Sequence, residues 1–337
     1  MSHHLLHRTI AGESVTREHA STLLRAFSAG HALPEQLAAA LTALRMRGES
    51  PEVLIGFAEV LREQYIPVEL AGLPAVDLCG TGGDGQSTVN LSTAAAFVVA
   101  GAGVPVAKHG NHGVSSKTGS ADVLRALGLP LDLTPEAVAR CIRELGIGFI
   151  YAPAHHPLFA KIGPVRRALG FRTAFNLLGP VCNPAQVKRQ VIGAFSVEAM
   201  RLIADVLAAL GTDRTFVIHT PGPYDEVSLT APAMVLEVSH GQITEHTFTP
   251  ADFGSRTLDP AELAGEGSES NAAHIEALLQ GQRDGVRQAV CANAACAIVV
   301  AGRADTLAEG FRMAEASIDS GAAYAKLQAL RAFVKES

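Results

Sequence analysis

Two glycine-rich segments each follow an apolar run and lead into a helix-like stretch. Gly-Thr-Gly-Gly-Asp-Gly fills positions 80–85, and the second segment begins with Lys108, His109, Gly110 and Asn111. Backbone N–H groups approach a ligand closely where glycine lacks Cβ, and a helix N-terminus adds unpaired donors. We therefore predict a phosphate cradle; tight turns with helix caps are the alternative. Gln86 after the first segment excludes the nucleotide-hydrolase loop, which needs Gly-Lys-Ser/Thr there.

Two adjacent carboxylates, Asp225 and Glu226, follow the apolar run 215–219. Strand-end loops of α/β sheets face the binding crevice. Paired carboxylates in such a loop suit Mg²⁺, which takes oxygen ligands and is often shared with phosphates. Ser92 and Asp84 could complete this metal shell. A solvated acidic turn is the alternative.

Other polar residues are less specific. One of Arg166 and Arg167 could hold a carboxylate through paired N–H donors, although a solvated helix start is the alternative. The histidines do not match a helical zinc motif and are expected to pack loops or contact substrate; they are His109, His112, His155 and His156.

The composition indicates a globular protein of 337 residues, with 48% apolar and 18% charged residues. Its formal net charge of −6 argues against general nucleic-acid or anionic-membrane binding. No apolar run is long enough for a membrane span, and no signal pattern opens the chain. The five cysteines show no zinc spacing, so we expect reduced thiols and a cytoplasmic location.

The pattern of apolar residues predicts two domains. Three- and four-residue spacing predicts a small helical domain over residues 1–70. Alternation of short apolar runs with alanine-rich stretches predicts a large α/β domain over residues 74–337, its mostly parallel sheet flanked by helices on both faces. The Pro- and Gly-rich segment 153–184 is expected to return to the helical domain as a hinge. Strands are expected at 75–78, 104–107, 147–151, 191–194, 215–219 and 234–238.

Taken together, these motifs resemble the anthranilate phosphoribosyltransferase family. The similarity runs in order over nearly the whole chain, through GTGGDG, Asn90-x-Ser92-Thr93, KHGN-x-x-VSS-x-x-GSAD (108–122), PVRR-x-LG-x-RT-x-FNLLGP-x-x-NP (164–184) and Asp225-Glu226-x-Ser228. It implies a nucleoside phosphorylase/phosphoribosyltransferase-like fold. It also implies transfer of the phosphoribosyl group of 5-phosphoribosyl-1-diphosphate to the anthranilate amine, a pentosyltransferase step of tryptophan biosynthesis. Two Mg²⁺ ions per subunit and a homodimer formed through the helical domain are further implications.

The resemblance also implies the site residues. Anthranilate would contact Gly80, Asn111 and Arg166, with Arg166 on its carboxylate, and Mg²⁺ would be held by Ser92, Asp225 and Glu226. The phosphoribosyl diphosphate would be bound by Gly80, Gly83, Asp84, Thr88, Asn90, Leu91, Ser92, Thr93, Lys108, His109, Gly110, Asn111, His112, Gly113, Val114, Ser115, Ser116 and Ser120. The aromatic amine is neutral at pH 7, so we assign no general base and expect positioning and leaving-group stabilisation to dominate.

Two departures from the family pattern concern the acceptor. His112 stands where many relatives have arginine and could replace that charge only when protonated. Tyr224 could narrow the metal loop. Two other functions stay open: a pyrimidine nucleoside phosphorylase-like enzyme, which the carboxylate pair opposes, and a non-catalytic nucleic-acid-binding relative, which the net charge opposes.

Overall fold

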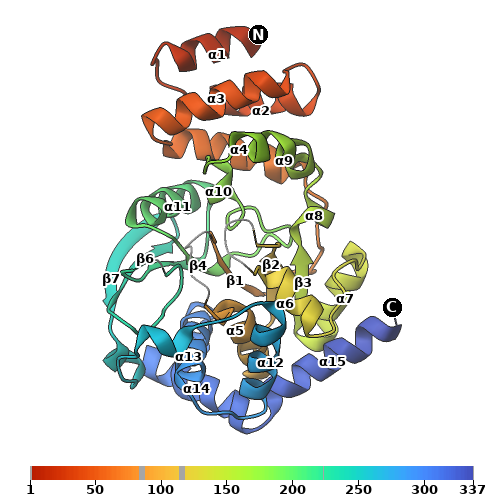
Figure 1. Cartoon of the computed structure of the whole chain (residues 1–337), viewed down its shortest axis with the longest axis vertical. Helices are drawn as coiled ribbons and strands as arrows, with labels where there is room; N and C mark the ends of the chain where they lie inside the picture. Colours follow the sequence, from red (N-terminus) through yellow and green to blue (C-terminus); the bar gives the residue numbers. More distant parts are fainter. Residues whose placement is uncertain (1, 83–87, 114–117, 223, 337) are drawn as a thin grey trace.

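A computed structural model describes residues 2–82, 88–113, 118–222 and 224–336. Its central feature is one sheet with the strand order β3-β2-β1-β4-β5-β6-β7 (Figure 1). Strands β1 to β5 run parallel, whereas β6 and β7 are each antiparallel to the strand before them. The strands are β1 Val76–Gly80, β2 Val106–Gly110, β3 Ile147–Tyr151, β4 Arg189–Gly193, β5 Arg214–His219, β6 Ala233–Ser239 and β7 Gln242–Phe248.

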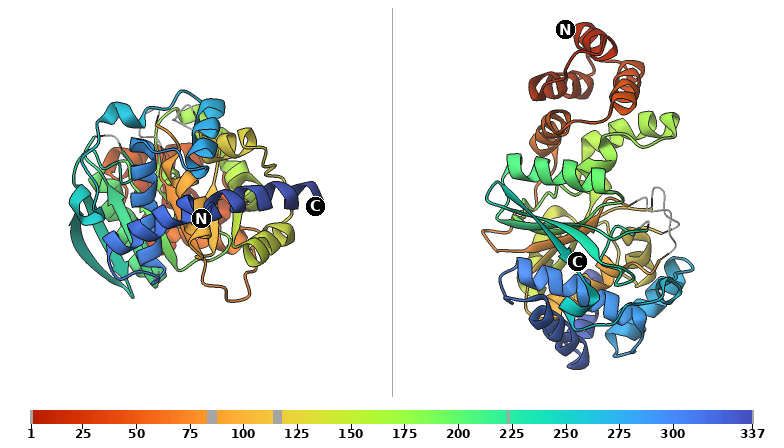
Figure 2. Two further views of the ribbon diagram at one scale, coloured as in Figure 1. Left: turned by 90° about the horizontal axis from the view of Figure 1, so that it is seen from below. Right: turned by 90° about the vertical axis from the view of Figure 1, so that its left-hand side faces the viewer.

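Helices cover both faces of the sheet and form a separate layer at the N-terminal end (Figures 1 and 2). The N-terminal helices are α1 Ser2–Ile10, α2 Arg17–Ser28, α3 Pro34–Arg47 and α4 Pro51–Gln64. The others are α5 Leu91–Gly101, α6 Ser120–Ala126, α7 Pro135–Leu145, α8 Ala152–His155, α9 Pro157–Leu169, α10 Phe175–Leu178, α11 Val197–Leu210, α12 Ser268–Leu279, α13 Gly285–Val300, α14 Leu307–Asp319 and α15 Ala322–Glu336. Short 3₁₀ turns occupy Pro250–Phe253 and Pro260–Leu263.

Two main apolar clusters hold the layers together. One packs α5 and α13 against one face of the sheet, and nearly every α13 side chain is buried because its sequence is alanine-rich and apolar on all sides. The other runs from α2 and α4 through α11 to the opposite face. Alternate residues of a strand serve the two clusters: Val191 faces the first and Ile192 the second.

The N-terminal helices form where their sequences place caps and breaks. Thr16 and Ser50 cap α2 and α4 through their hydroxyls, and prolines open α3 and α4. Gly56 lets α4 approach α2 closely, because a Cβ there would lie 2.9 Å from that of Ala20. Helices α9 and α10, from the segment 153–184, pack against this layer. Whether that segment is a hinge, and where the domains divide, stay predictions.

The predicted fold class is confirmed. Each expected strand overlaps one of β1–β6. The sequence reasoning missed β7, a mostly exposed edge strand with polar side chains that shows no apolar alternation. Of the described helices, none is both long and apolar enough to cross a lipid bilayer.

The order of the strands fixes where a ligand can bind. Strands β2 and β3 extend the sheet on one side of β1, whereas β4 and β5 extend it on the other side, so the order in which strands are added reverses between β1 and β4. Ligands of open α/β sheets bind at such a switch point, beyond the carboxyl ends of the strands. Gly80 and Gly193 end β1 and β4 there, as register partners.

Candidate active site

Asp225 lies over this switch point, packed onto both glycines. A Cβ at Gly80 would overlap the Asp225 carboxylate, and a Cβ at Gly193 would overlap its backbone carbonyl. The Gly82 N–H donates to Asp225 Oδ2 at 2.8 Å. The first glycine-rich segment and the acidic pair, far apart in sequence, therefore meet where the topology predicts a ligand.

Glu226 is tied to the start of α5. The Ser92 N–H donates to Glu226 Oε1 at 2.8 Å. Lys108 from the end of β2 reaches under the same helix start, where its ammonium donates to Leu78 O and lies 3.3 Å from Ser92 Oγ. Because Lys108 is buried, its charge lies inside the protein beside the N-terminus of α5 and not at the surface.

Burial raises the pKa of both acidic residues. For Asp225, the Gly82 N–H and the charges of Lys108 and Arg172 offset part of that rise. For Glu226, the charge of Asp225 raises the pKa further, while the bond from Ser92 opposes it. Two neighbouring buried carboxylates repel each other when both are ionised, and a bound cation would remove that repulsion.

The donor set fits Mg²⁺. Ser92, Asp225 and Glu226 line one small cavity and offer a hydroxyl and two carboxylates, all oxygen ligands. Within the described ranges, no three His, Cys, Asp or Glu side chains gather as a metal-binding group. A site with two carboxylates suits an ion that keeps waters and binds substrate phosphates, as Mg²⁺ does. Tyr224 is buried, with its ring beside Gly222.

The second glycine-rich segment is closed by Asp122. Its carboxylate accepts from the N–H groups of Gly113 (3.1 Å) and Gly119 (2.8 Å) and contacts His112 Nδ1 at 2.6 Å. Burial would raise the Asp122 pKa, but these hydrogen bonds outweigh it and hold the pKa below its usual range. The ionised carboxylate thus joins the two ends of the 112–119 loop.

His112 faces Tyr151 as well as Asp122. Since an ionised carboxylate only accepts, His112 Nδ1 carries the proton toward Asp122. His112 Nε2 lies 2.5 Å from the Tyr151 hydroxyl and 3.3 Å from Arg125 Nη1. The His112 side chain is therefore fixed by partners on β3 and α6.

His109 forms a buried pair with His156. His109 Nδ1 lies 3.2 Å from Gly179 O, so Nδ1 donates and Nε2 accepts from His156 Nε2, also at 3.2 Å. Burial lowers the pKa of both rings, that of His156 to about 4. Both are neutral at pH 7 and join the end of β2 to the start of α9. This placement matches the loop-packing alternative.

Arg166 lies half-buried on α9. Its guanidinium makes no hydrogen bond or ion pair with any residue that the structure describes, and burial lowers its pKa. Arg167 is exposed. In the right-hand view of Figure 2, α9 and α12 lie on the same side of the molecule, above and below the sheet.

The remaining predicted residues fall into three groups. Asn111, Gly110 and Ser120 meet at the start of the second loop, where Ser120 Oγ donates to Asn111 O at 3.4 Å. Leu91 and Thr93 are buried in α5, and the Thr93 hydroxyl has no partner in the described part of the chain. Gly83, Asp84, Val114, Ser115 and Ser116 lie outside the described residues.

Two buried asparagines were missed by the sequence reasoning. Asn293 on α13 pairs with both backbone groups of Val227, the residue after the acidic pair. Asn271 on α12 donates to Thr88 O and Asn90 Oδ1. No local motif marks either one, because each acts on a distant segment.

Comparisons with known proteins agree with this geometry. The family model described as "Glycosyl transferase family, a/b domain" matches residues 72–324, and that described as "Glycosyl transferase family, helical bundle domain" matches residues 3–65. Anthranilate phosphoribosyltransferase from Moorella thermoacetica is 47% identical, over 97% of each chain.

Solved structures are similar over the whole fold. Anthranilate phosphoribosyltransferase from Thermus thermophilus superposes with a TM-score of 0.92 at 40% identity, over 98% of this chain and 99% of that one. The Saccharomyces cerevisiae enzyme in complex with PRPP and Mg superposes with a TM-score of 0.91 at 25% identity, over 99% of this chain and 98% of that one. The resemblance seen in the sequence is confirmed, and the chain belongs to the anthranilate phosphoribosyltransferase family.

Proposed function

We propose that the chain transfers the phosphoribosyl group of 5-phosphoribosyl-1-diphosphate to the amine of anthranilate. The observation that carries this is the position of Asp225 and Glu226, over the β1–β4 switch point and against the N-terminus of α5. A diphosphate leaving group is stabilised by positive charge, and this place offers the positive end of a helix and two carboxylates that can hold a counter-cation.

The reaction breaks the bond between C1 and the diphosphate oxygen and forms a bond between C1 and nitrogen. The electron pair of the broken bond leaves with the diphosphate, and the amine proton passes to water after nitrogen has attacked. The positive end of the α5 dipole and the buried charge of Lys108 stabilise the leaving group. When held by Ser92, Asp225 and Glu226, Mg²⁺ supplies further charge stabilisation to the diphosphate.

The acceptor is held rather than activated. Arg166 binds the anthranilate carboxylate. This role is supported because its guanidinium has no competing partner among the described residues. Gly80 and Asn111 complete the acceptor contacts. A neutral aromatic amine needs no prior deprotonation, so orientation next to C1 accounts for this part of catalysis.

Two Mg²⁺ ions act in each subunit. Ser92, Asp225 and Glu226 would hold the Mg²⁺ ions, which would neutralise charge on the diphosphate. Titration of the protein with Mg²⁺ in the presence of 5-phosphoribosyl-1-diphosphate should show two equivalents. A single equivalent would contradict this proposal.

The subunit forms a homodimer through its N-terminal helices. Three large apolar side chains in this layer are exposed: Ile10 at 61%, Leu33 at 62% and Met46 at 84%. Light scattering should give twice the mass of 35.1 kDa, and Met46→Glu should shift the protein toward the monomer. A monomeric native protein would contradict the proposal.

The five buried, unpaired cysteines support a cytoplasmic location.

Release of diphosphate tests the function against its alternatives. With Mg²⁺ and 5-phosphoribosyl-1-diphosphate, diphosphate should appear only after anthranilate is added, one equivalent for each anthranilate consumed. Uridine phosphorolysis at a comparable rate would favour the phosphorylase-like alternative. Salt-dependent DNA binding without any transfer would favour the nucleic-acid-binding alternative.

A further inference from the structure

We propose that Asn271 is a positioning residue that sets the orientation of the Asn90 amide and thereby aims its NH₂ group at the diphosphate. This inference rests on the proposed function, because it concerns the same donor site. Asn271 lies on α12 and is 1% exposed. Its side chain bridges α12 to the end of the first glycine-rich segment.

The hydrogen bonds of Asn271 determine which way both amides point. Asn271 Nδ2 lies 3.2 Å from Thr88 O and 2.9 Å from Asn90 Oδ1. Thr88 O is a backbone carbonyl and can only accept, so the Asn271 atom facing it must be the NH₂ group. The second proton of that NH₂ group then requires an acceptor on Asn90, which fixes Asn90 Oδ1 toward Asn271 and leaves Asn90 Nδ2 on the other side.

Among the described residues, the NH₂ group of Asn90 has no competing partner. Asn90 is the N-cap residue of α5, but its side chain makes no capping bond. No hydrogen bond from Asn90 Nδ2 to the described residues occurs. Its two amide protons therefore lie at the positive end of α5, where an anionic oxygen of the diphosphate would accept them.

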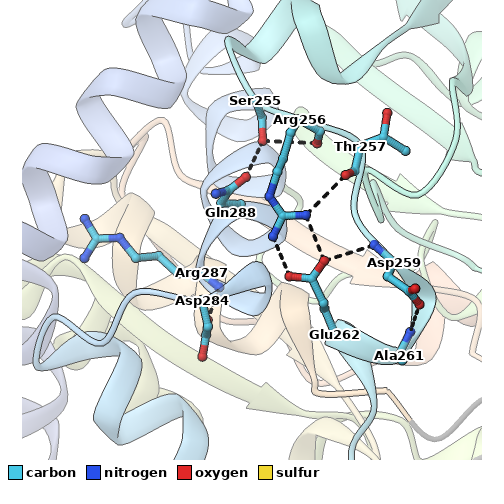
Figure 3. A network of polar contacts seen from close by, with 9 residues as sticks. All are labelled: Ser255, Arg256, Thr257, Asp259, Ala261, Glu262, Asp284, Arg287 and Gln288. Atoms are coloured by element: carbon cyan, nitrogen blue, oxygen red, sulfur yellow. Dashed lines mark hydrogen bonds and ion pairs between the residues drawn. The ribbon is translucent and has the colours of Figure 1, made fainter.

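The segment that precedes α12, the helix of Asn271, is held by a network of polar contacts. Figure 3 shows Arg256 paired with both carboxylate oxygens of Glu262, at 2.8 and 2.5 Å, and Ser255 donating to Gln288 of α13 at 2.6 Å. This network fixes the 255–265 segment to α13.

The fixed segment is in turn joined to the loop. Leu263 O accepts from the Val89 N–H at 3.1 Å, and Ala264 forms a bridge with Thr88. A Cβ at Gly265 would lie 2.8 Å from Thr88 O, so glycine is needed for this close approach. Asn271 Oδ1 is buried without a partner in the described part of the chain. Among the described residues, the two donor bonds are therefore the polar contacts that hold this amide.

Binding of Mg²⁺ with inorganic diphosphate, measured by calorimetry, tests this inference without the acceptor. Asn90→Ala and Asn271→Ala should each weaken the affinity about tenfold, as expected for loss of one hydrogen bond to a charged group. The double variant should bind about as weakly as Asn90→Ala alone, because Asn271 acts through Asn90. Gln288→Ala is the matched control: it removes only the bond from Ser255, leaves the Arg256–Glu262 pair and both bonds of Asn271 in place, and should bind normally.

Three results would overturn the inference: unchanged affinity in Asn271→Ala, a double variant as weak as the product of the single effects, or an equal loss in Gln288→Ala. If Asn271→Ala does not fold, Asn271→Asp replaces it. Its carboxylate attracts the Asn90 NH₂ group away from the site, so tight diphosphate binding by this variant would also refute the proposal. Normal diphosphate binding by a native protein that does not consume anthranilate would instead show failure of the proposed function.

Discussion

Gly193→Ala places a methyl group where the backbone of Asp225 lies. The added Cβ would overlap the Asp225 carbonyl oxygen and carbon and lie 3.3 Å from its Cα. Since non-bonded carbon and oxygen atoms settle near van der Waals separation, the Asp225 backbone must move by about 2 Å. Metal ligands tolerate displacements of only about 0.2 Å, and a misplacement of about 1 Å costs about a hundredfold in rate. We expect kcat/KM to fall at least a hundredfold.

The assay is anthranilate fluorescence decay at saturating Mg²⁺, with a thermal melt of each variant. Overpacking should lower the stability of Gly193→Ala by about 1–3 kcal/mol. Gly80→Ala separates the two effects: its Cβ would lie 3.0 Å from Asp225 Cγ, and the side chain can turn away, so activity falls while stability holds. The control is Gly163→Ala, whose Cβ meets only the exposed Arg167 side chain among the described residues. Near-normal activity of Gly193→Ala would refute the reasoning.

Three further predictions concern other parts of the site. Arg166→Ala should raise the anthranilate KM about tenfold or more, as expected for a lost charge-assisted bond, with little effect on the donor KM; equal loss for both substrates would contradict its role. Asp122→Asn places an NH₂ group against the loop N–H donors, so steady-state kinetics should show about a tenfold higher donor KM. His156 is neutral in the fold, with a pKa of about 4, but titrates near 6.5 when unfolded. The free energy of unfolding is therefore highest above pH 6.5 and decreases as the pH falls toward 4. His156→Phe should reduce this pH dependence, measured by urea unfolding.

The sequence predicted the strands that are buried. Runs such as 147–151 and 215–219 are apolar and short, so their pattern is local and readable. Strand β7 was not predicted because it lies at the edge of the sheet and exposes polar side chains. The turn before it is a two-residue hairpin loop in which His240 and Gly241 both have positive φ, and in the sequence Gly241 was the available signal for it.

The site residues could be predicted where they lie close together in the sequence. The glycine-rich segments and the Asp225-Glu226 pair are such patterns. Asn271 is not, because 181 residues separate it from Asn90 and only the packing of α12 brings them together. The contacts of His112 could not be predicted either, because its partners Asp122 and Tyr151 lie on different elements.

Anthranilate fluorescence decay in the presence of 5-phosphoribosyl-1-diphosphate and Mg²⁺ tests the central claim most directly. The native protein should consume anthranilate, and EDTA should abolish the fluorescence decay. The double variant Asp225→Asn, Glu226→Gln should lose turnover, and extra anthranilate should not restore it. Decay that persists with EDTA, or in a folded double variant, would contradict the assignment of the acidic pair. No decay with the native, folded protein would contradict the proposed function itself.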